Sequence, residues 1–155
     1  MNNKKLIKMK SYELIESYEL PSVKCCYSSL LFITNVIVCY YYKYYLYSLL
    51  FAGLTISSVI HHSHKTFLSY SIDKFFVFSV VGYGSYVFFN KIFENIFNIY
   101  YAIIVVITFL GTIILYYYGS LKGCFVFGKD INECDKWHQL LHLLSSLGHH
   151  FIIFM

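Results

Sequence analysis

Apolar residues gather in five runs along this chain, separated by short polar stretches. The runs are Tyr27–Tyr42, Tyr44–Ile60, Phe75–Asn90, Ile96–Tyr118 and Trp137–Met155. A bilayer core takes about 20 residues of helix, with a range of about 17–25, so each run predicts one membrane-spanning helix. Helices of a soluble bundle would show a polar face, and these runs show none. The pattern therefore predicts an all-α, multi-pass transmembrane helical bundle of about five spans.

Between the first two runs, the stretch from Tyr27 to Ile60 is interrupted only by Lys43. As one helix, rising about 1.5 Å per residue, it would be too long for a bilayer, so we expect a tight hairpin near Lys43. Residues 1–26 are polar and charged, without the apolar core of a cleavable signal peptide. We interpret them as a polar N-terminal arm, followed by a transmembrane helical domain over 27–155.

Charge supports the membrane interpretation and indicates an orientation. Only 13% of residues are charged, against about 25% in soluble domains. The lysines fall mostly on the N-terminal side of the predicted bundle, and only Lys43 and Lys91 fall on the other. The positive-inside rule makes the N-terminal side cytosolic. No basic helix face or RNA-binding motif is present, so we expect no nucleic-acid partner.

Polar residues with metal-binding chemistry occur at three places along the chain. His138 and His142 are four residues apart and so lie on one helix face. Ser58 and His62 have the same spacing near the end of the second run, and Asp73 precedes the third. The predicted topology brings all of them to one side of the membrane, where ionisable groups are costly and usually functional.

This set predicts a catalytic zinc site. Three neutral imidazoles, from His62, His138 and His142, match the ligand count of catalytic zinc, which keeps a fourth position for water. Zinc lowers the pKa of that water to about 7. Asp73 would orient the water and carry its proton to a leaving group. Ser58 would hydrogen-bond the water or a developing oxyanion.

The spacing leaves some assignments open. Ser57 with His61 has the same separation as Ser58 with His62. His149 lies about 10 Å further along the last helix than His142 and is interpreted as a supporting or structural residue. Interhelical hydrogen bonding alone would also place polar residues inside a membrane bundle.

The motifs resemble those of the membrane hydrolase superfamily of alkaline ceramidases, post-GPI-attachment phospholipases, and progestin and adiponectin receptors. Its pattern is Ser-x3-His ending one helix, Asp starting the next and His-x3-His starting the last. The gap from His62 to Asp73 is similar to that of the ceramidase and phospholipase branches, which favours His62 over His61. The resemblance implies a reduced form of a seven-span fold. It also implies zinc on His62, His138 and His142, with hydrolysis of a lipid amide or ester bond.

The resemblance further implies a membrane lipid substrate, sphingolipid-like or phospholipid-like, and an endomembrane location. The ceramidase site is lumenal, whereas the lysines favour a cytosolic one, so the face of the site stays open. If five spans leave the lipid cavity incomplete, a homo-oligomer would complete it. The main alternative is a non-enzymatic membrane protein in which these residues brace the bundle or bind metal without catalysis. A metal transporter and a haem protein are weaker alternatives.

Overall fold

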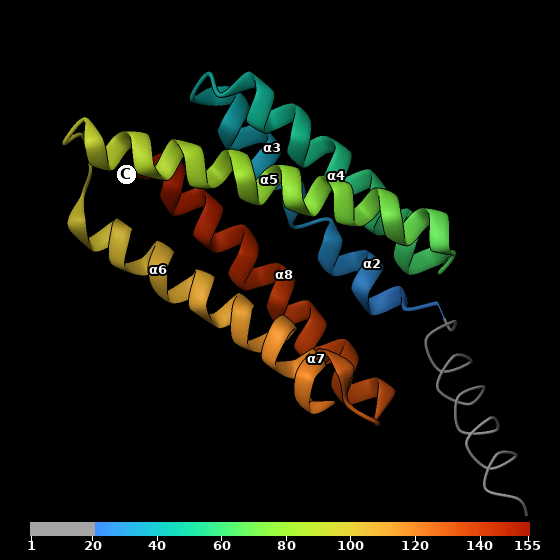
Figure 1. Cartoon of the computed structure of the whole chain (residues 1–155). Helices are drawn as coiled ribbons and strands as arrows, with labels where there is room; N and C mark the ends of the chain where they lie inside the picture. Colours follow the sequence, from blue (N-terminus) through green and yellow to red (C-terminus); the bar gives the residue numbers. More distant parts are fainter. Residues whose placement is uncertain (1–20) are drawn as a thin grey trace, which may run out of the picture.

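The computed structural model describes residues 21–155, and every regular element in that part of the chain is helical (Figure 1). Residues 1–20 of the predicted arm at 1–26 lie outside the described residues. The first described helix begins at Val23, within the predicted arm. The elements are α2 (Val23–Ser29), α3 (Phe32–Tyr41), α4 (Tyr45–Ser63), α5 (Phe67–Phe93), α6 (Ile99–Ile113), the π-helix η1 (Ile114–Tyr118), α7 (Gly119–Lys122), the 3-10 helix η2 (Phe125–Phe127) and α8 (Ile131–Phe154).

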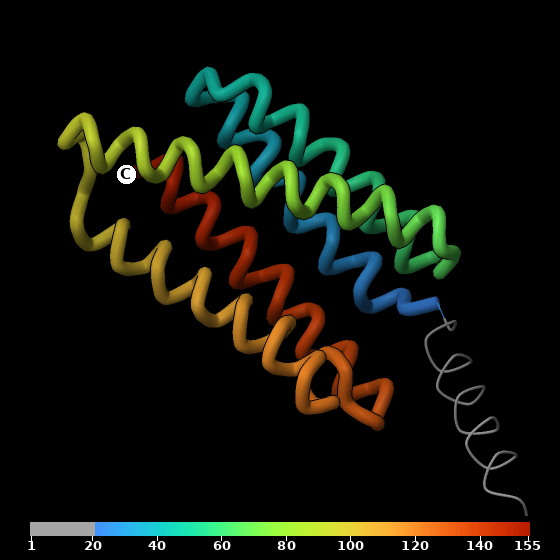
Figure 2. Tube along the Cα trace, viewed as in Figure 1, coloured from blue at the N-terminus to red at the C-terminus, as the bar shows by residue number. Residues whose placement is uncertain are grey.

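These elements form five rods that alternate in direction (Figures 1 and 2). The first rod is α2 with α3, and the fourth is α6 continued by η1 and α7. The second, third and last are α4, α5 and α8. Figure 2 shows that the beginnings of α2, α5 and α8 lie at the same end of the bundle as the end of α4. The up-and-down course therefore brings the predicted site segments to one end.

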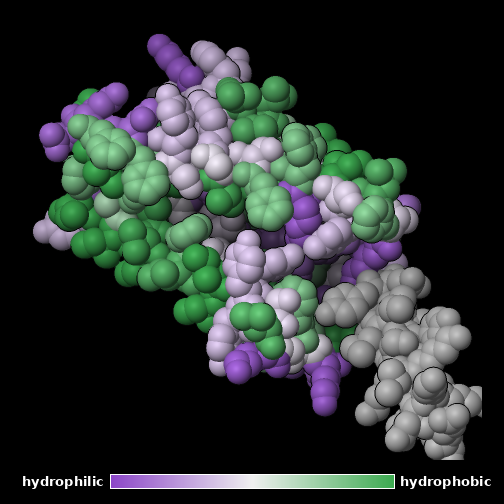
Figure 3. Space-filling model, in the orientation of Figure 1, coloured by the Kyte–Doolittle hydropathy of each residue, from purple (hydrophilic) through white to green (hydrophobic). Residues whose placement is uncertain are grey.

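Three stretches of the described chain are long and apolar enough to cross a membrane, namely Val23–Tyr41, Phe67–Phe93 and Ile99–Phe127. The all-α membrane fold predicted from the sequence is confirmed to this extent. The remaining rods, α4 and α8, carry the serines and histidines of the candidate site, which lowers their apolar character. Large apolar side chains project outward over much of the surface, with Phe67 86% exposed and Phe93 79% exposed. Figure 3 shows the apolar surface spread along the flank of the bundle, as expected for contact with lipid.

The predicted hairpin near Lys43 is confirmed. The third helix ends at Tyr41, and α4 begins at Tyr45. Lys43 has a φ of 67°, in the left-handed region, and the Tyr44 amide donates to the Cys39 carbonyl at 2.8 Å. This reversal packs α3 against α4.

Two helices begin earlier than the apolar pattern indicated. The helix predicted from Phe75 starts at Phe67, because Thr66 and Ser69 form a reciprocal capping box there. The helix predicted from Trp137 starts at Ile131, where the Asp130 side chain caps the first turn. The sequence interpretation placed Asp73 and His138 at helix starts. Each lies instead about two turns inside its helix.

The apolar core lies where α3, α4, α5 and α8 meet. Tyr47 and Phe51 of α4 are fully buried, and they pack with Phe32, Val80 and Ile153. At the site end of the bundle, α2 packs against both α4 and α8, while α6 packs along α8. The short helix α2 therefore joins the two helices that carry the candidate histidines.

Candidate metal centre

Three histidines from two helices meet at the site end of the bundle. His62, near the end of α4, lies with His138 and His142 of α8, and one nitrogen from each ring falls within 4.8 Å of the others. The His62 ring centroid is 4.7 Å from that of His138 and 5.4 Å from that of His142. His62 and His142 are buried, and His138 is partly buried. The arrangement can hold one metal ion, and its three residues are the ligands predicted from the sequence.

The two α8 histidines form one edge of this site, because their spacing places both rings on one helix face. Their ring centroids are 4.8 Å apart. His142 also contacts the edge of Phe32, at 5.3 Å between ring centroids. This packing limits the rotation of the His142 ring and fixes the direction of its nitrogens.

Ser28 of α2 orients His142. Its hydroxyl donates to the Cys25 carbonyl at 3.1 Å and lies 2.8 Å from Nδ1 of His142. A hydroxyl has one hydrogen, so Ser28 then accepts a hydrogen bond from Nδ1–H. That tautomer leaves Nε2 of His142 with the lone pair that a metal requires. Hydrogen bonds of this kind orient metal-ligating histidines in many proteins.

Ser58, the predicted assisting residue, is also tied to α2. Its hydroxyl lies 2.9 Å from Oγ of Ser29, and Ser29 donates to the Cys25 carbonyl at 2.8 Å. The oxygen of Ser29 can therefore accept from Ser58, whose hydroxyl also lies within reach of the Asp73 carboxyl group. In this arrangement Ser58 holds α4 against α2. A role for Ser58 toward a substrate stays a prediction.

Asp73 is buried in α5, opposite the end of α4, and Ser57 and Ser58 lie beside its carboxyl group. Its Oδ2 atom is 3.6 Å from Nζ of Lys74. Among the described residues, Oδ1 of Asp73 is the only fully buried side-chain nitrogen or oxygen without a hydrogen-bond partner. Buried polar atoms are nearly always bonded, so this oxygen is available to a further group.

The structure distinguishes His61 from His62, which spacing alone left open, by their orientation. His62 faces α8, whereas His61 faces α5. Nδ1 of His61 lies 3.4 Å from Oγ of Ser69, and its ring packs against Tyr70. His61 therefore supports the α4–α5 contact and is not one of the three converging histidines.

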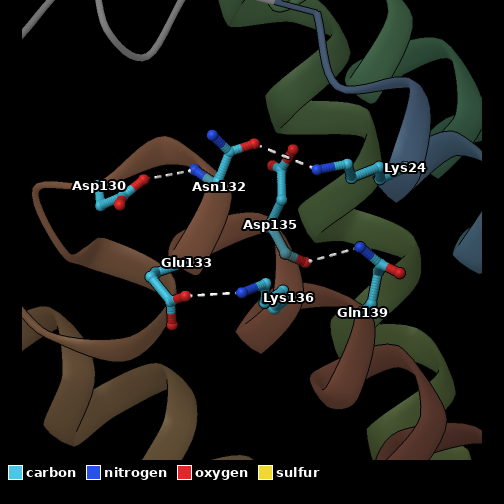
Figure 4. A network of polar contacts seen from close by, with 7 residues as sticks. All are labelled: Lys24, Asp130, Asn132, Glu133, Asp135, Lys136 and Gln139. Carbon is cyan, nitrogen blue, oxygen red and sulfur yellow. Dashed lines mark hydrogen bonds and ion pairs between the residues drawn. The ribbon is translucent and has the colours of Figure 1, made fainter.

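Polar contacts at the start of α8 hold this helix next to α2 (Figure 4). Lys24 donates to Oδ1 of Asn132 at 3.1 Å, and the thiol of Cys25 lies 3.6 Å from Asp135. Further along the turn, Lys136 pairs with Glu133 at 2.7 Å, and this hydrogen bond raises the pKa of Lys136. These contacts fix the segment that leads into His138.

The remaining α8 histidines lie deeper in the bundle, away from the three that converge. His149 is buried, bonds the Tyr47 hydroxyl through Nδ1 and packs against Phe51. His150 lies 3.1 Å from Nδ2 of Asn35 and 2.7 Å from the Ser146 carbonyl through the same ring nitrogen. Both connect helices. His149 is thus structural, as the spacing suggested, and His150 braces α3 against α8.

The sequence analysis missed the two serines of α2. Ser28 and Ser29 stand within an apolar run, where a hydroxyl usually bonds its own helix backbone, and nothing local distinguishes them. The indication that exists is that the two serines are adjacent. Adjacent residues of a helix point in different directions, so each hydroxyl can reach a different neighbouring helix. All five cysteines of the chain are free thiols.

Comparisons of the chain with protein-family models, with curated proteins and with solved structures find no match. The chain's own geometry gives a consistent description. Residues 21–155 are helical, with three candidate membrane spans and a buried group of three histidines that can hold a metal ion.

Proposed function

We propose that this chain is an integral membrane hydrolase that uses zinc, held by His62, His138 and His142, to cleave an amide or ester bond of a membrane lipid. The motif resemblance to the ceramidase superfamily supports this reaction class, with the chain as a shortened form of a seven-span fold. The expected substrate is sphingolipid-like or phospholipid-like, in an endomembrane.

The three histidine nitrogens are suitable ligands for zinc. The three imidazole nitrogens lie within 4.8 Å of one another, so they would draw together slightly to bind one ion at zinc–nitrogen distances of about 2.0–2.1 Å. Structural zinc sites close all four positions with protein ligands, whereas three histidines leave one position open, as catalytic sites do. When bound, zinc supplies a Lewis acid that polarises a carbonyl and acidifies water at the open position.

The observation that carries the proposal is the convergence of His62, His138 and His142, with the buried carboxyl group of Asp73 next to Ser58, one turn before His62 on α4. In the described part of the chain, Oδ1 of Asp73 makes no hydrogen bond that would commit it to bracing the helices. Oδ1 can instead accept a proton during attack on the scissile carbonyl and return it to the leaving group. Ser58 and Ser29 hold the adjacent turn of α4 in place while this proton moves.

An apolar cavity further along the bundle, lined by His149 and not by the three converging histidines, could take an acyl chain. It has a volume of about 420 Å³ and lies between α5, α6 and α8, within the usual range of ligand pockets of about 300–1,000 Å³. Its α8 lining begins at Leu144 and Ser145, just past His142, and continues to Ile152. An acyl chain lying there would occupy the part of the bundle beyond His142, at the depth of His149.

The first test is the metal content of detergent-purified protein. Wild type should contain about one zinc per chain, and the His138→Ala/His142→Ala double variant should contain none. Wild type that is folded but takes up no zinc would overturn the proposal. It would leave the histidines as helix-packing groups of a non-enzymatic membrane protein.

The second test separates metal binding from catalysis. Asp73→Asn keeps the size of the side chain but removes its basicity, so it should retain zinc and lose hydrolysis of ester and amide lipids by about 10²–10⁴-fold. Glu94→Gln, at the far end of α5, is the matched control and should hydrolyse like wild type. If no lipid is hydrolysed although zinc is bound, the site binds metal without catalysis.

A further inference from the structure

Lys74 places a positive charge inside a candidate membrane span. It lies in α5, within the stretch Phe67–Phe93, and its side chain is only 21% exposed. Charged groups at such positions are costly and are usually retained for a function. Its contact with Asp73, at 3.6 Å, is an ion-pair distance but too long for a hydrogen bond. The ammonium group of Lys74 therefore keeps donor capacity for another acceptor.

Two aromatic rings hold the ammonium group of Lys74 within the bundle. Nζ of Lys74 lies 5.3 Å from the ring centroid of Tyr70 and 4.9 Å from that of Tyr116. A lysine near a membrane interface normally extends toward water. Lys74 follows Asp73, whose carboxyl group lies beside Ser58, one turn before His62 on α4. Lys65, in the turn between α4 and α5, adds a second positive charge that acts on His62 and His138.

The charges around the site leave it positive once a divalent ion is bound. Three neutral imidazoles do not reduce the charge of the ion. The negative charge of Asp73 lowers the total charge of the site by one unit, and the positive charge of Lys74 raises it by one unit again. The site therefore keeps the full charge of the ion, with Lys65 adding to it at the edge. A positive, partly desolvated site attracts anions strongly, because Coulomb interactions are less screened there than in water.

We propose that Lys74 recognises an anionic head group, such as a phosphate, next to the bond that is cleaved, so that the substrates are anionic rather than neutral lipids. This inference rests on the proposed function for its reaction and on Lys74 for its specificity. The ammonium group would donate to the anionic oxygens while its cation–π contacts with Tyr70 and Tyr116 hold it in place. The neutral head group of a ceramide would leave this donor without a partner.

The test compares two lipids that share one oleoyl ester and differ in one phosphate. Dissociation constants for oleoyl lysophosphatidic acid and for monoolein are measured on zinc-loaded protein in a nonionic detergent. Wild type should bind the phosphate lipid at least about tenfold more tightly, as expected for hydrogen bonds to charged groups. Lys74→Gln should reduce that ratio about tenfold, and Lys74→Arg should restore it. Lys122→Gln, which removes an exposed lysine of α7, should leave the ratio unchanged.

The outcomes separate this inference from the proposed function. Equal binding of the two lipids by wild type, or a ratio insensitive to Lys74→Gln, overturns the inference even if both lipids are hydrolysed. A binding preference that depends on Lys74 supports it, and hydrolysis is then measured separately as the test of the enzyme. If Lys74→Gln weakens only inhibition by oleate, Lys74 contacts the product carboxylate, and the head-group assignment is wrong.

Discussion

The hydroxyl of Ser28 lies 2.8 Å from Nδ1 of His142, so a short helix that carries none of the three histidines contacts the ring of one of them. The adjacent Ser29 bonds Ser58 on α4 at 2.9 Å. Neighbouring serines of α2 thus reach both helices of the metal centre. This arrangement makes the geometry of the site depend on α2 as well as on the ligands.

Ser28→Ala should weaken zinc binding about 10–100-fold, because it removes the hydrogen bond that orients His142. The effect is measured by competition with a zinc chelator of known affinity. Ser71→Ala removes an exposed hydroxyl that bonds only its own helix, so it is the control and should bind zinc like wild type. Equal affinities for the two variants would show that Ser28 does not orient the ligand.

His62→Ala should abolish stoichiometric zinc binding, whereas His61→Ala should retain it, because only His62 faces α8. Metal analysis of the two purified variants provides the comparison. The variants differ by one position, so general effects of losing an imidazole from α4 are matched. Loss of zinc from His61→Ala alone would place the ligand on the other face of α4.

Zinc should stabilise the folded bundle, because a ligand that binds only the native state shifts unfolding by mass action. At a free zinc concentration 100 times Kd, the expected gain is about 2.7 kcal/mol. Thermal unfolding in detergent, with zinc or with EDTA, measures this gain. The His138→Ala/His142→Ala variant should show no difference between the two conditions, and a shift in that variant would indicate zinc bound elsewhere.

Gly84→Ala should destabilise the fold by about 1–3 kcal/mol, as overpacking of a core does. A Cβ atom at Gly84 would lie 2.9 Å from the ring of His149 and would also meet the Tyr47 hydroxyl. Gly82, two residues earlier on α5, has open space around its Cα. Gly82→Ala should therefore be neutral or stabilise the helix by about 0.5–1 kcal/mol. Unfolding of both variants by heat or by SDS provides the measurement.

Several features of the fold could be predicted from the sequence because they depend on local pattern. Long apolar runs indicated the rods, and the isolated Lys43 marked the hairpin. The starts of α5 and α8 were misjudged because their first turns are polar and are defined by caps at Thr66 and Asp130. Hydropathy indicates where a helix becomes apolar, not where its hydrogen bonding begins.

The residues of the candidate site also divide into those that the local pattern predicts and those that it does not. Convergence of His138 and His142 follows from helix periodicity, and the addition of His62 follows from an up-and-down topology with an odd number of rods. The roles of Ser28 and Lys74 depend on which faces of distant helices meet. That information arises from tertiary packing, which spacing along the chain does not contain.

Joining α4 to α8 through α2 has a consequence for biosynthesis. His62 is made early, but His138 and His142 emerge from the ribosome only after four of the five rods have been synthesised. Of the three ligands, a nascent chain holds only His62 until its last rod has inserted beside α2, although His61 and His64 are also made early. Metal loading would then follow assembly, so the cell could not use the ion to start folding, and zinc content would report completed molecules.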